Sequence, residues 1–312
     1  MRLVFMGTPE FAVPSLAAIV EAGFAVLAVV TQPDRPQGRG MRVSPPPVKE
    51  KALELGLPIL QPQRLSDSRC VTAISEMRPD AIVVVAFGQF LPKALLNLPP
   101  RGCINVHPSL LPLYRGASPI QQAILDGVAE TGVTTMYLDE GMDTGDVIAQ
   151  VATPIGDEDD AGSLHDRLAS IGAGLLVETL QQVIAGTVLR RPQDHSLASV
   201  TKRLKREDGS VDWNLDSATV ANQVRAFSPW PGAFTVLDGR RVKIWRAVTG
   251  SFSVKSSPGC VIAVSDEGLE VACGRGTLLV QELQPENSKR MLASSFARGY
   301  RVTTATCFQG RT

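Results

Sequence analysis

Residues 81–86 have the sequence Ala-Ile-Val-Val-Val-Ala, an apolar run that contains no polar side chain. Comparable short runs occur at residues 3–6, 24–30 and 103–106, and helix-like stretches separate them. Short continuous apolar runs that alternate with helical patterns are typical of parallel strands buried on both faces. We therefore predict an α/β fold, in which a doubly wound, mostly parallel sheet carries helices on both faces.

The last third of the chain has a different pattern. Short strand-like segments follow one another closely, and Asp238-Gly239 and residues 266–268 provide turn signals between them. Such a series predicts a small antiparallel β-barrel. The segments are residues 233–237, 242–248, 259–264, 269–273 and 277–283.

A length of 312 residues suggests about two domains, at roughly 150 residues each. We expect the first domain at residues 1–188, with an amphipathic helix over residues 164–184 closing it against the sheet. A linker at residues 189–206 would lead to a second domain at residues 207–312. The chain starts with too short an apolar run for a signal peptide, and no run of 18 apolar residues predicts a membrane span.

The five cysteines form no Cys-x-x-Cys pair, and their spacing matches no zinc pattern. Their number is odd, which fits a reducing compartment better than a disulfide framework. We therefore expect a cytoplasmic protein without a metal. We also expect a monomer, although the cysteines do not bear on this. The cysteines are Cys70, Cys103, Cys260, Cys273 and Cys307.

The formal net charge is zero, with 31 basic and 31 acidic residues, but it is unevenly distributed. Residues 1–200 contain 15 basic and 21 acidic residues, a net charge of −6, so the remaining residues carry +6. A basic excess in one part of a chain suggests an anionic partner for that part. Chance surface charge on two ordinary domains is the alternative.

Residues 31–50 (TQPDRPQGRGMRVSPPPVKE) interrupt the α/β pattern with a long polar connection. A loop above about 12–15 residues is usually functional or disordered. This one carries Arg35, Arg39 and Arg42, so we consider it a candidate contact for an anion, with a solvated surface insertion as the alternative.

The segment Asn105-Val106-His107-Pro108 directly follows one of the buried strands. Ligands of open α/β sheets bind beyond the carboxyl ends of the strands, and alternate strand residues share a face. Pro108 should end the strand there. An amide donor and an imidazole on one face suit a reaction that develops an oxyanion, so Asn105 and His107 are our candidate catalytic residues. For His165 and His195 we retain a structural role.

A second chemical signal is the acidic segment 139–146, Asp-Glu-Gly-Met-Asp-Thr-Gly-Asp. Its spacing is not that of a calcium loop, and a carboxylate that orients His107 is the simpler interpretation. Spacing alone does not distinguish Asp143 from Asp146, and an acidic solvated turn is the alternative.

Several of these stretches together resemble the methionyl-tRNA formyltransferase family. The similar stretches are MGTPEFAVPSL (6–16), TQPDRPQGRG (31–40), NVHPSLLPLYRGASPI (105–120), TGVTTMYLDEGMDTGDVI (131–148), KREDGSVDWN (205–214) and FSPWPGAF (227–234). The resemblance covers nearly the whole chain in order. It implies a Rossmann-like formyltransferase domain followed by a barrel of the oligonucleotide-binding (OB) type.

The resemblance also implies an activity: transfer of a formyl group from 10-formyltetrahydrofolate to methionine on the initiator tRNA. The family motif makes Asn105, His107 and Asp143 the catalytic residues and places Ser109, Leu110, Leu111 and Pro112 along the folate site. Arg39, in the Gly38-Arg39-Gly40 loop, would reach the acceptor end of the tRNA, and the basic second domain would hold the RNA further along. We assign the tRNA contacts to Arg35, Arg39, Arg42, Lys202, Arg203, Lys205 and Arg206.

The sequence departs from the family pattern at two places. Met41 and Arg42 follow the Gly-Arg-Gly unit where lysines are frequent, and Leu113 stands where a basic residue is frequent. Both changes reduce the number of local phosphate contacts that we expect, and neither affects the proposed catalytic residues.

Four other functions compete with this interpretation. A formyltransferase acting on a nucleotide-linked amino sugar would share the Asn-x-His segment but would not need the Arg-rich loop. A glycinamide ribonucleotide formyltransferase would not need residues 207–312. A nicotinamide dehydrogenase would require the Gly-x-Gly-x-x-Gly spacing that residues 7–10 lack. The non-enzymatic alternative is an RNA-binding module on an inactive scaffold.

Overall fold

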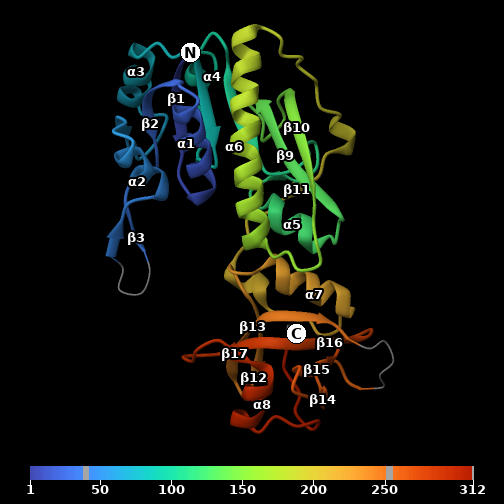
Figure 1. The fold of residues 1–312 in the computed structure, drawn as a ribbon. Helices are drawn as coiled ribbons and strands as arrows, with labels where there is room; N and C mark the ends of the chain where they lie inside the picture. Colours follow the sequence, from blue (N-terminus) through green and yellow to red (C-terminus); the bar gives the residue numbers. More distant parts are fainter. Residues whose placement is uncertain (38–41, 251–255, 311–312) are drawn as a thin grey trace. The chain divides into compact units, whose positions relative to one another are not determined.

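The computed structural model describes residues 1–37, 42–250 and 256–310 (Figure 1). The chain forms two compact units, each assembled from three segments. The N-terminal unit consists of residues 1–116, 130–154 and 165–201. The C-terminal unit consists of residues 117–129, 155–164 and 202–312.

A seven-stranded sheet in the order β10-β9-β7-β6-β1-β2-β5 forms the centre of the N-terminal unit. Its five strands from β7 to β5 are parallel, whereas β9 and β10 are antiparallel to their neighbours. This arrangement confirms the predicted mostly parallel α/β sheet. The strands are β1 (Arg2–Gly7), β2 (Ala25–Val30), β5 (Ile59–Leu60), β6 (Ala81–Val85), β7 (Cys103–His107), β9 (Glu130–Tyr137) and β10 (Val147–Pro154).

Every residue of β6 and β7 is buried, as their apolar sequences predict. The long helix α6 (Ala161–Ala185) packs on β7 and β9 through Gly172, where an added Cβ would lie 2.9 Å from a methyl of Val106. The other helices of this unit are η1 (Glu10–Ala12), α1 (Val13–Glu21), α2 (Pro47–Glu54), α3 (Ser68–Glu76), α4 (Lys93–Leu96) and η2 (His195–Leu197).

By length and composition, α6 is the one helix in the described part of the chain that is apolar enough to cross a membrane. Half of its most apolar stretch is buried inside the protein, as in the core helix of a globular domain. Its charged residues include Asp166 and Arg167, and Leu168, Leu176 and Leu180 are fully buried.

The long polar connection forms a small antiparallel hairpin of β3 (Arg35–Gln37) and β4 (Arg42–Ser44). Residues 38–41, which include Arg39, lie outside the described residues. At the base of the hairpin, the Asp34 carboxylate accepts hydrogen bonds from Lys49 Nζ at 2.7 Å and from Gln61 Nε2 at 2.7 Å. These contacts connect the hairpin to α2 and to the segment after β5.

The C-terminal unit contains an antiparallel sheet in the order β12-β13-β16-β15-β14, with β17 paired to β16. Helix α7 (Ser217–Ala226) packs against α5 (Pro119–Leu125) and against β13. The strands are β12 (Ala233–Leu237), β13 (Arg240–Thr249), β14 (Val261–Val264), β15 (Leu269–Ala272), β16 (Thr277–Pro285) and β17 (Met291–Leu292). The remaining elements are η3 (Arg206–Gly209) and α8 (Ala293–Tyr300) here, and β8 (Arg115–Gly116) and β11 (Val200–Thr201) in the N-terminal unit.

The antiparallel sheet was predicted, but among the described residues no ladder joins β12 to β14, so a closed barrel is not found. The C-terminal residues lie between these two edge strands instead. Val236 of β12 exchanges backbone hydrogen bonds with Gln309, and Cys260 bridges Cys307. A single extended segment therefore occupies the place where a closing strand pair was expected.

Cys260 and Cys307 also form a disulfide, which the odd cysteine count and the spacing did not predict. The two residues are 47 positions apart, and only the antiparallel bridge between their segments places them opposite each other. Cys70, Cys103 and Cys273 are free.

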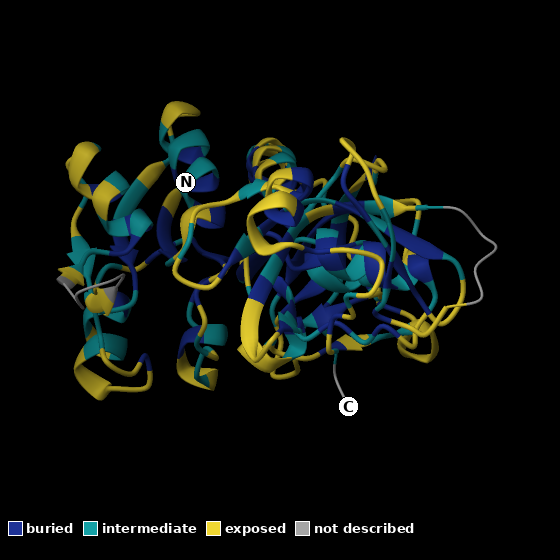
Figure 2. Cartoon of the chain, turned by 90° about the horizontal axis from the view of Figure 1, so that it is seen from below, coloured by how far each residue is buried: buried dark blue, intermediate teal, exposed yellow. Residues whose placement is uncertain are grey.

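The apolar core follows the sheets in both units. In the view of Figure 2, buried residues occupy the strands, whereas exposed residues lie on turns and on the outer faces of helices. The core of the C-terminal unit includes Trp213, Ile244, Leu278, Phe296 and Phe308.

Candidate active site

The carboxyl end of β7 carries the two side chains that the sequence singled out. Asn105 and His107 are 8% and 4% exposed, respectively. The strand extends to His107, so strand alternation places both side chains on the same face. Within the described residues the Asn105 side-chain amide has no hydrogen-bond partner, which leaves its two N–H donors for a ligand.

The ring of His107 is held between a carbonyl and a carboxylate. Its Nε2 lies 3.0 Å from the backbone oxygen of Tyr114, and its Nδ1 lies 3.7 Å from Oδ2 of Asp143. A carbonyl oxygen only accepts hydrogen bonds, so Nε2 carries the proton. In the neutral ring, Nδ1 is then the basic nitrogen, and after protonation its N–H faces the Asp143 carboxylate.

Asp143 lies in the acidic loop between β9 and β10, and its backbone adopts the left-handed conformation with φ +54°. Its Oδ2 accepts a hydrogen bond of 2.8 Å from the backbone N–H of Gly116. Gly116 has φ +106°, and an added Cβ there would lie 2.8 Å from the backbone oxygen of Thr201. A glycine therefore allows the close approach that delivers this N–H to Asp143.

The other acidic residues of this loop have different roles. Asp139 accepts bonds from Gly141 N and Thr144 Oγ1 and so shapes the turn, and the exposed Glu140 pairs with Lys93 at 2.8 Å. Nowhere in the described ranges do three or more His, Cys, Asp or Glu side chains form a potential metal site. Asp143 is the residue of this loop whose carboxylate lies beside His107, with Oδ2 3.7 Å from Nδ1.

The loop that follows His107 is fixed by one hydroxyl. Thr134 Oγ1, on β9, donates to Ser109 O at 2.6 Å and accepts from Leu111 N at 3.1 Å and from Gln150 Nε2 at 3.0 Å. Ser109 is fully buried, and its hydroxyl donates to Leu113 O. The loop is therefore held by hydrogen bonds in a single conformation next to His107.

The four residues expected along the folate site differ in exposure. Ser109 and Leu111 are buried, and Leu111 packs against Met136 and Val147. Leu110 and Pro112 are partly exposed. These two offer the loop's accessible apolar surface.

Behind the acidic loop lies a set of residues that the sequence pattern does not predict. Residues 191–201 pack along the N-terminal unit: Arg191 pairs with Val147, and Val200 of β11 pairs with Arg115 of β8. The side chain of Gln193 bonds to Arg115 and to the acidic loop. The segment 191–201 has the sequence of an ordinary polar connection, so no local pattern indicates a role for Gln193. Arg115 and Gly116 do belong to the stretch 105–120, which carries part of the family resemblance.

Cys103, in β7 beside Asn105, is no candidate nucleophile. Burial raises the pKa of its thiol to about 12, and its Sγ donates to Leu95 O. The nucleophilic thiolate is therefore not populated at neutral pH.

The basic residues chosen from the sequence fall into two groups. Arg35 is exposed and bonds Gln32, Arg42 belongs to β4, and Arg39 lies outside the described residues. The other group stands at the start of the C-terminal unit, where all four side chains are exposed and, in the described part of the chain, none forms an ion pair. That group consists of Lys202, Arg203, Lys205 and Arg206.

A further basic surface, which the sequence did not reveal, lies on the outer side of β12 and β13. Arg241 covers the ring of Phe234 at 3.8 Å, and Lys243 Nζ lies 3.6 Å from the centre of the Trp245 ring. Arg290 approaches the same Trp245 ring at 5.0 Å. Burial, followed by the nearby Arg290 charge, lowers the pKa of Lys243, and Arg290 is itself paired with the Glu282 carboxylate.

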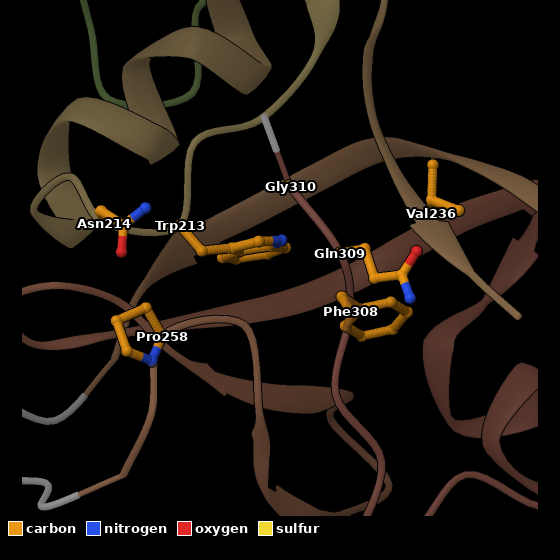
Figure 3. Close-up of a pocket in the computed structure, with 7 residues that line it drawn as sticks. All are labelled: Trp213, Asn214, Val236, Pro258, Phe308, Gln309 and Gly310. Atoms are coloured by element: carbon orange, nitrogen blue, oxygen red, sulfur yellow. The ribbon is translucent and has the colours of Figure 1, made fainter. Parts of the chain in front are cut away.

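A pocket in the C-terminal unit is lined by apolar and amide groups (Figure 3). Trp213 and Phe308 stack there with ring centres 6.2 Å apart, and Gln309 is beside Phe308. Its lining contains no titratable side chain, so it lacks the groups for acid–base or nucleophilic chemistry.

Comparisons with known proteins show the family of the chain. Residues 1–180 match the family described as formyl transferase, and residues 203–301 match the formyl transferase C-terminal domain. A methionyl-tRNA formyltransferase from Geobacter sulfurreducens is 50% identical over 307 residues, which cover 98% of this chain and 96% of the relative. One from Syntrophus aciditrophicus is 49% identical over 306 residues, which cover 98% of each chain.

Two solved structures show the same fold at low identity. The sugar 3N-formyl transferase WlaRD is 19% identical with a TM-score of 0.66, over 93% of this chain and 99% of that one. HypX from Aquifex aeolicus, in complex with tetrahydrofolic acid, is 20% identical with a TM-score of 0.64, over 95% of this chain and 47% of that one.

Proposed function

The chain belongs to the formyl transferase family, and we propose that it transfers the formyl group of 10-formyltetrahydrofolate to the α-amino group of methionine on initiator tRNA. The product is N-formylmethionyl-tRNA for translation initiation. The observation that carries this proposal is about 50% identity to methionyl-tRNA formyltransferases over nearly the whole chain. The cluster of Asn105, His107 and Asp143 at the carboxyl end of β7 supports it.

In this proposal the neutral α-amine attacks the formyl carbon and forms a tetrahedral intermediate with an oxyanion and an ammonium. Asn105 donates its free amide N–H to the oxyanion. His107 takes a proton from the ammonium at Nδ1, and Asp143, 3.7 Å away, stabilises the imidazolium that results. When the oxyanion collapses and the carbon–nitrogen bond to folate breaks, the leaving folate nitrogen gains the proton that His107 took, and the imidazole is neutral again.

The folate co-substrate is assigned to the loop after His107. Ser109, Leu110, Leu111 and Pro112 form its near wall, with Leu110 and Pro112 offering apolar surface and Ser109 and Leu111 supporting the backbone. No step requires a metal, because the charge that develops is met by an amide, an imidazole and a carboxylate.

The tRNA is assigned to the basic residues of both units. The side chains of Lys202, Arg203, Lys205 and Arg206 form no ion pair in the described ranges, which leaves them for phosphates. The surface of Lys243, Trp245 and Arg290 combines cations with an aromatic ring, as RNA-binding surfaces do. Arg35 and Arg42 belong to the hairpin strands, and Arg39 lies between them in the sequence; we assign all three to the acceptor end.

For the organisation of the chain we propose a catalytic domain at residues 1–188, a linker at 189–206 and a tRNA-binding domain at 207–312. The antiparallel sheet of the last domain is proposed to be an OB-type barrel that the C-terminal segment completes, since residues 306–309 bond to both edges. We further propose a cytoplasmic monomer.

The test is turnover with purified full-length protein, 10-formyltetrahydrofolate and methionyl-tRNA, with formylmethionine as the readout. His107→Ala should retain tRNA binding and lose most of the turnover, because the base at Nδ1 is removed. Equal activity in that variant removes His107 from the mechanism. A nucleotide-linked amino sugar run in parallel should not be formylated, and RNA binding without turnover would identify an inactive scaffold.

A further inference from the structure

We infer that Gln193 is a positioning residue for the formyl transfer: its side-chain amide holds the acidic loop in the conformation that places Asp143 beside His107. The inference rests on the catalytic role proposed for Asp143. Gln193 lies in the segment after α6, far in sequence from both residues. It contacts the backbone of Asp143, but neither the Asp143 carboxylate nor the His107 ring.

All four hydrogen-bonding positions of the Gln193 amide are in use. Its Oε1 accepts from Arg115 Nε at 3.1 Å and from Nη2 at 2.6 Å, and its Nε2 donates to the backbone oxygens of Asp143 at 2.9 Å and Gly145 at 2.7 Å. The side chain is 7% exposed. A guanidinium only donates and a carbonyl only accepts, so the partners fix which end of the amide is nitrogen.

Asp143 requires such support because φ +54° is uncommon for a residue with a side chain. Two hydrogen bonds hold it there: Gln193 binds its backbone oxygen, and Gly116 N binds its carboxylate. Together they fix both ends of Asp143, so its Oδ2 faces His107 Nδ1.

Arg115 strengthens this connection. Its guanidinium is 6% exposed, and its side-chain partners among the described residues are the neutral Gln193 and His195 Nδ1, at 3.1 Å. A buried cation at Oε1 polarises the amide and makes its N–H groups better donors. Arg115, Gln193 and the acidic loop therefore form one continuous hydrogen-bonded chain.

Two substitutions distinguish a role in positioning Asp143 from a role that is limited to accepting the Arg115 hydrogen bonds. Gln193→Met removes all four hydrogen bonds at nearly constant size. Gln193→Glu retains the acceptor for Arg115 as an ion pair, but its oxygens repel the carbonyls of Asp143 and Gly145. Since small displacements of a catalytic group cost up to about 100-fold, we expect both variants to lower kcat by about 10–100-fold. KM for tRNA and folate should remain within about twofold.

The matched control is Gln223→Met, because Gln223 Nε2 also donates to two backbone oxygens, those of Asp208 and Ser210, each at 3.1 Å. It should lower the unfolding temperature and leave kcat unchanged. In an Asp143→Asn background, Gln193→Met should reduce single-turnover rates by less than about twofold further, because both changes act on one carboxylate.

The outcomes separate this inference from the proposed function. Full activity of Asp143→Asn would overturn the catalytic role of Asp143 and the positioning role with it. An inactive Asp143→Asn together with wild-type turnover in Gln193→Glu would overturn the positioning role alone, because Gln193 would then serve only Arg115. Additive losses in the double variant would likewise overturn it.

Discussion

At the scale of single residues, buried hydroxyl and amide groups fix the site loops. Thr134 is fully buried, and its Oγ1 connects Ser109 O, Leu111 N and Gln150 Nε2. The removal of such a buried hydroxyl is destabilising mainly because its hydrogen-bond partners are left without a donor or an acceptor. The loop after His107 therefore depends on a β9 side chain as much as on its own sequence.

Replacing Thr134 by Val should lower the free energy of unfolding by about 1–3 kcal/mol, because Ser109 O loses its donor and Leu111 N its acceptor. It should also raise KM for folate, because the loop loses its fixed conformation. Urea denaturation and steady-state kinetics measure the two effects. The control is Thr179→Val, because among the described residues the Thr179 hydroxyl bonds Thr135 Oγ1 alone, at 2.8 Å. This variant should reduce stability without changing KM for folate. An unchanged KM in Thr134→Val would contradict this account.

At the scale of elements, the β3–β4 hairpin shows how a polar connection becomes ordered. The sequence predicted a long functional loop, and the structure forms a hairpin whose base is fixed by Asp34, Lys49 and Gln61. The hydrogen bond from Gln61, followed by that from Lys49, lowers the pKa of Asp34 below its ordinary value of 3.8. No local sequence pattern contains this contact, because Gln61 lies 27 positions from Asp34.

The lowered pKa has a defined consequence for stability. Because the folded pKa is below the unfolded one, these contacts stabilise the protein fully above pH 3.8, and the contribution is lost as pH falls through the lower, folded value. In an NMR titration, both Gln61→Leu and Lys49→Met should raise the Asp34 pKa, because each removes a hydrogen bond that favours the carboxylate. On acidification, Asp34→Asn should lose less stability than the wild type, because it has no carboxylate at this position to protonate. Identical acid-unfolding curves for the variant and the wild type would argue against the effect.

At the scale of the whole molecule, a neutral chain contains an acidic part and a basic part, of −6 over residues 1–200 and +6 beyond them. Phosphate contacts by Lys and Arg give an affinity that falls with salt. The exposed cluster at residues 202–206 lies at the start of the C-terminal unit, and the surface around Trp245 belongs to the same unit.

Replacing Lys202, Arg203, Lys205 and Arg206 by Gln should raise KM for tRNA and flatten its salt dependence, by about 0.7–0.9 in log–log slope for each lost phosphate contact. KM for folate should not change. The matched control is Arg64→Gln with Arg69→Gln, which removes exposed charge from the region of α3. Equal salt slopes in the cluster variant and the wild type would exclude the cluster from the tRNA contact.

The disulfide should stabilise the C-terminal unit alone. It closes a segment of 47 residues that contains β14 to β17 and α8, and closing such a loop stabilises a fold by about 2–4 kcal/mol. Cys260→Ala with Cys307→Ala should therefore lower the midpoint of that unit's unfolding transition, and a dithiol reductant should affect only the wild type. Cys70→Ala, at a free cysteine, is the control. A wild-type transition that does not respond to reductant would refute the prediction.

The sequence by itself predicted a mostly parallel α/β sheet followed by an antiparallel sheet, and it singled out the candidate catalytic residues. Buried parallel strands must be apolar throughout, so residues 81–86 and 103–106 revealed the sheet, and the end of β7 followed from Asn105 to Pro108. Spacing left open which carboxylate faces His107, because Asp143 and Asp146 lie only three positions apart in the same loop. Tertiary structure decided it, since Gly116 and Gln193 hold Asp143 from segments 27 and 50 residues away.

Tertiary structure also decided which segment lies beside the edges of the C-terminal sheet and which cysteines pair. The apolar pattern of a strand specifies which face it buries, but not which backbone lies beside its edge. The C-terminal segment occupies both edges and brings Cys307 to Cys260. Contacts between distant segments depend on the packing of whole elements. Only the folded chain therefore brings Arg115, Gly116 and Gln193 together around Asp143.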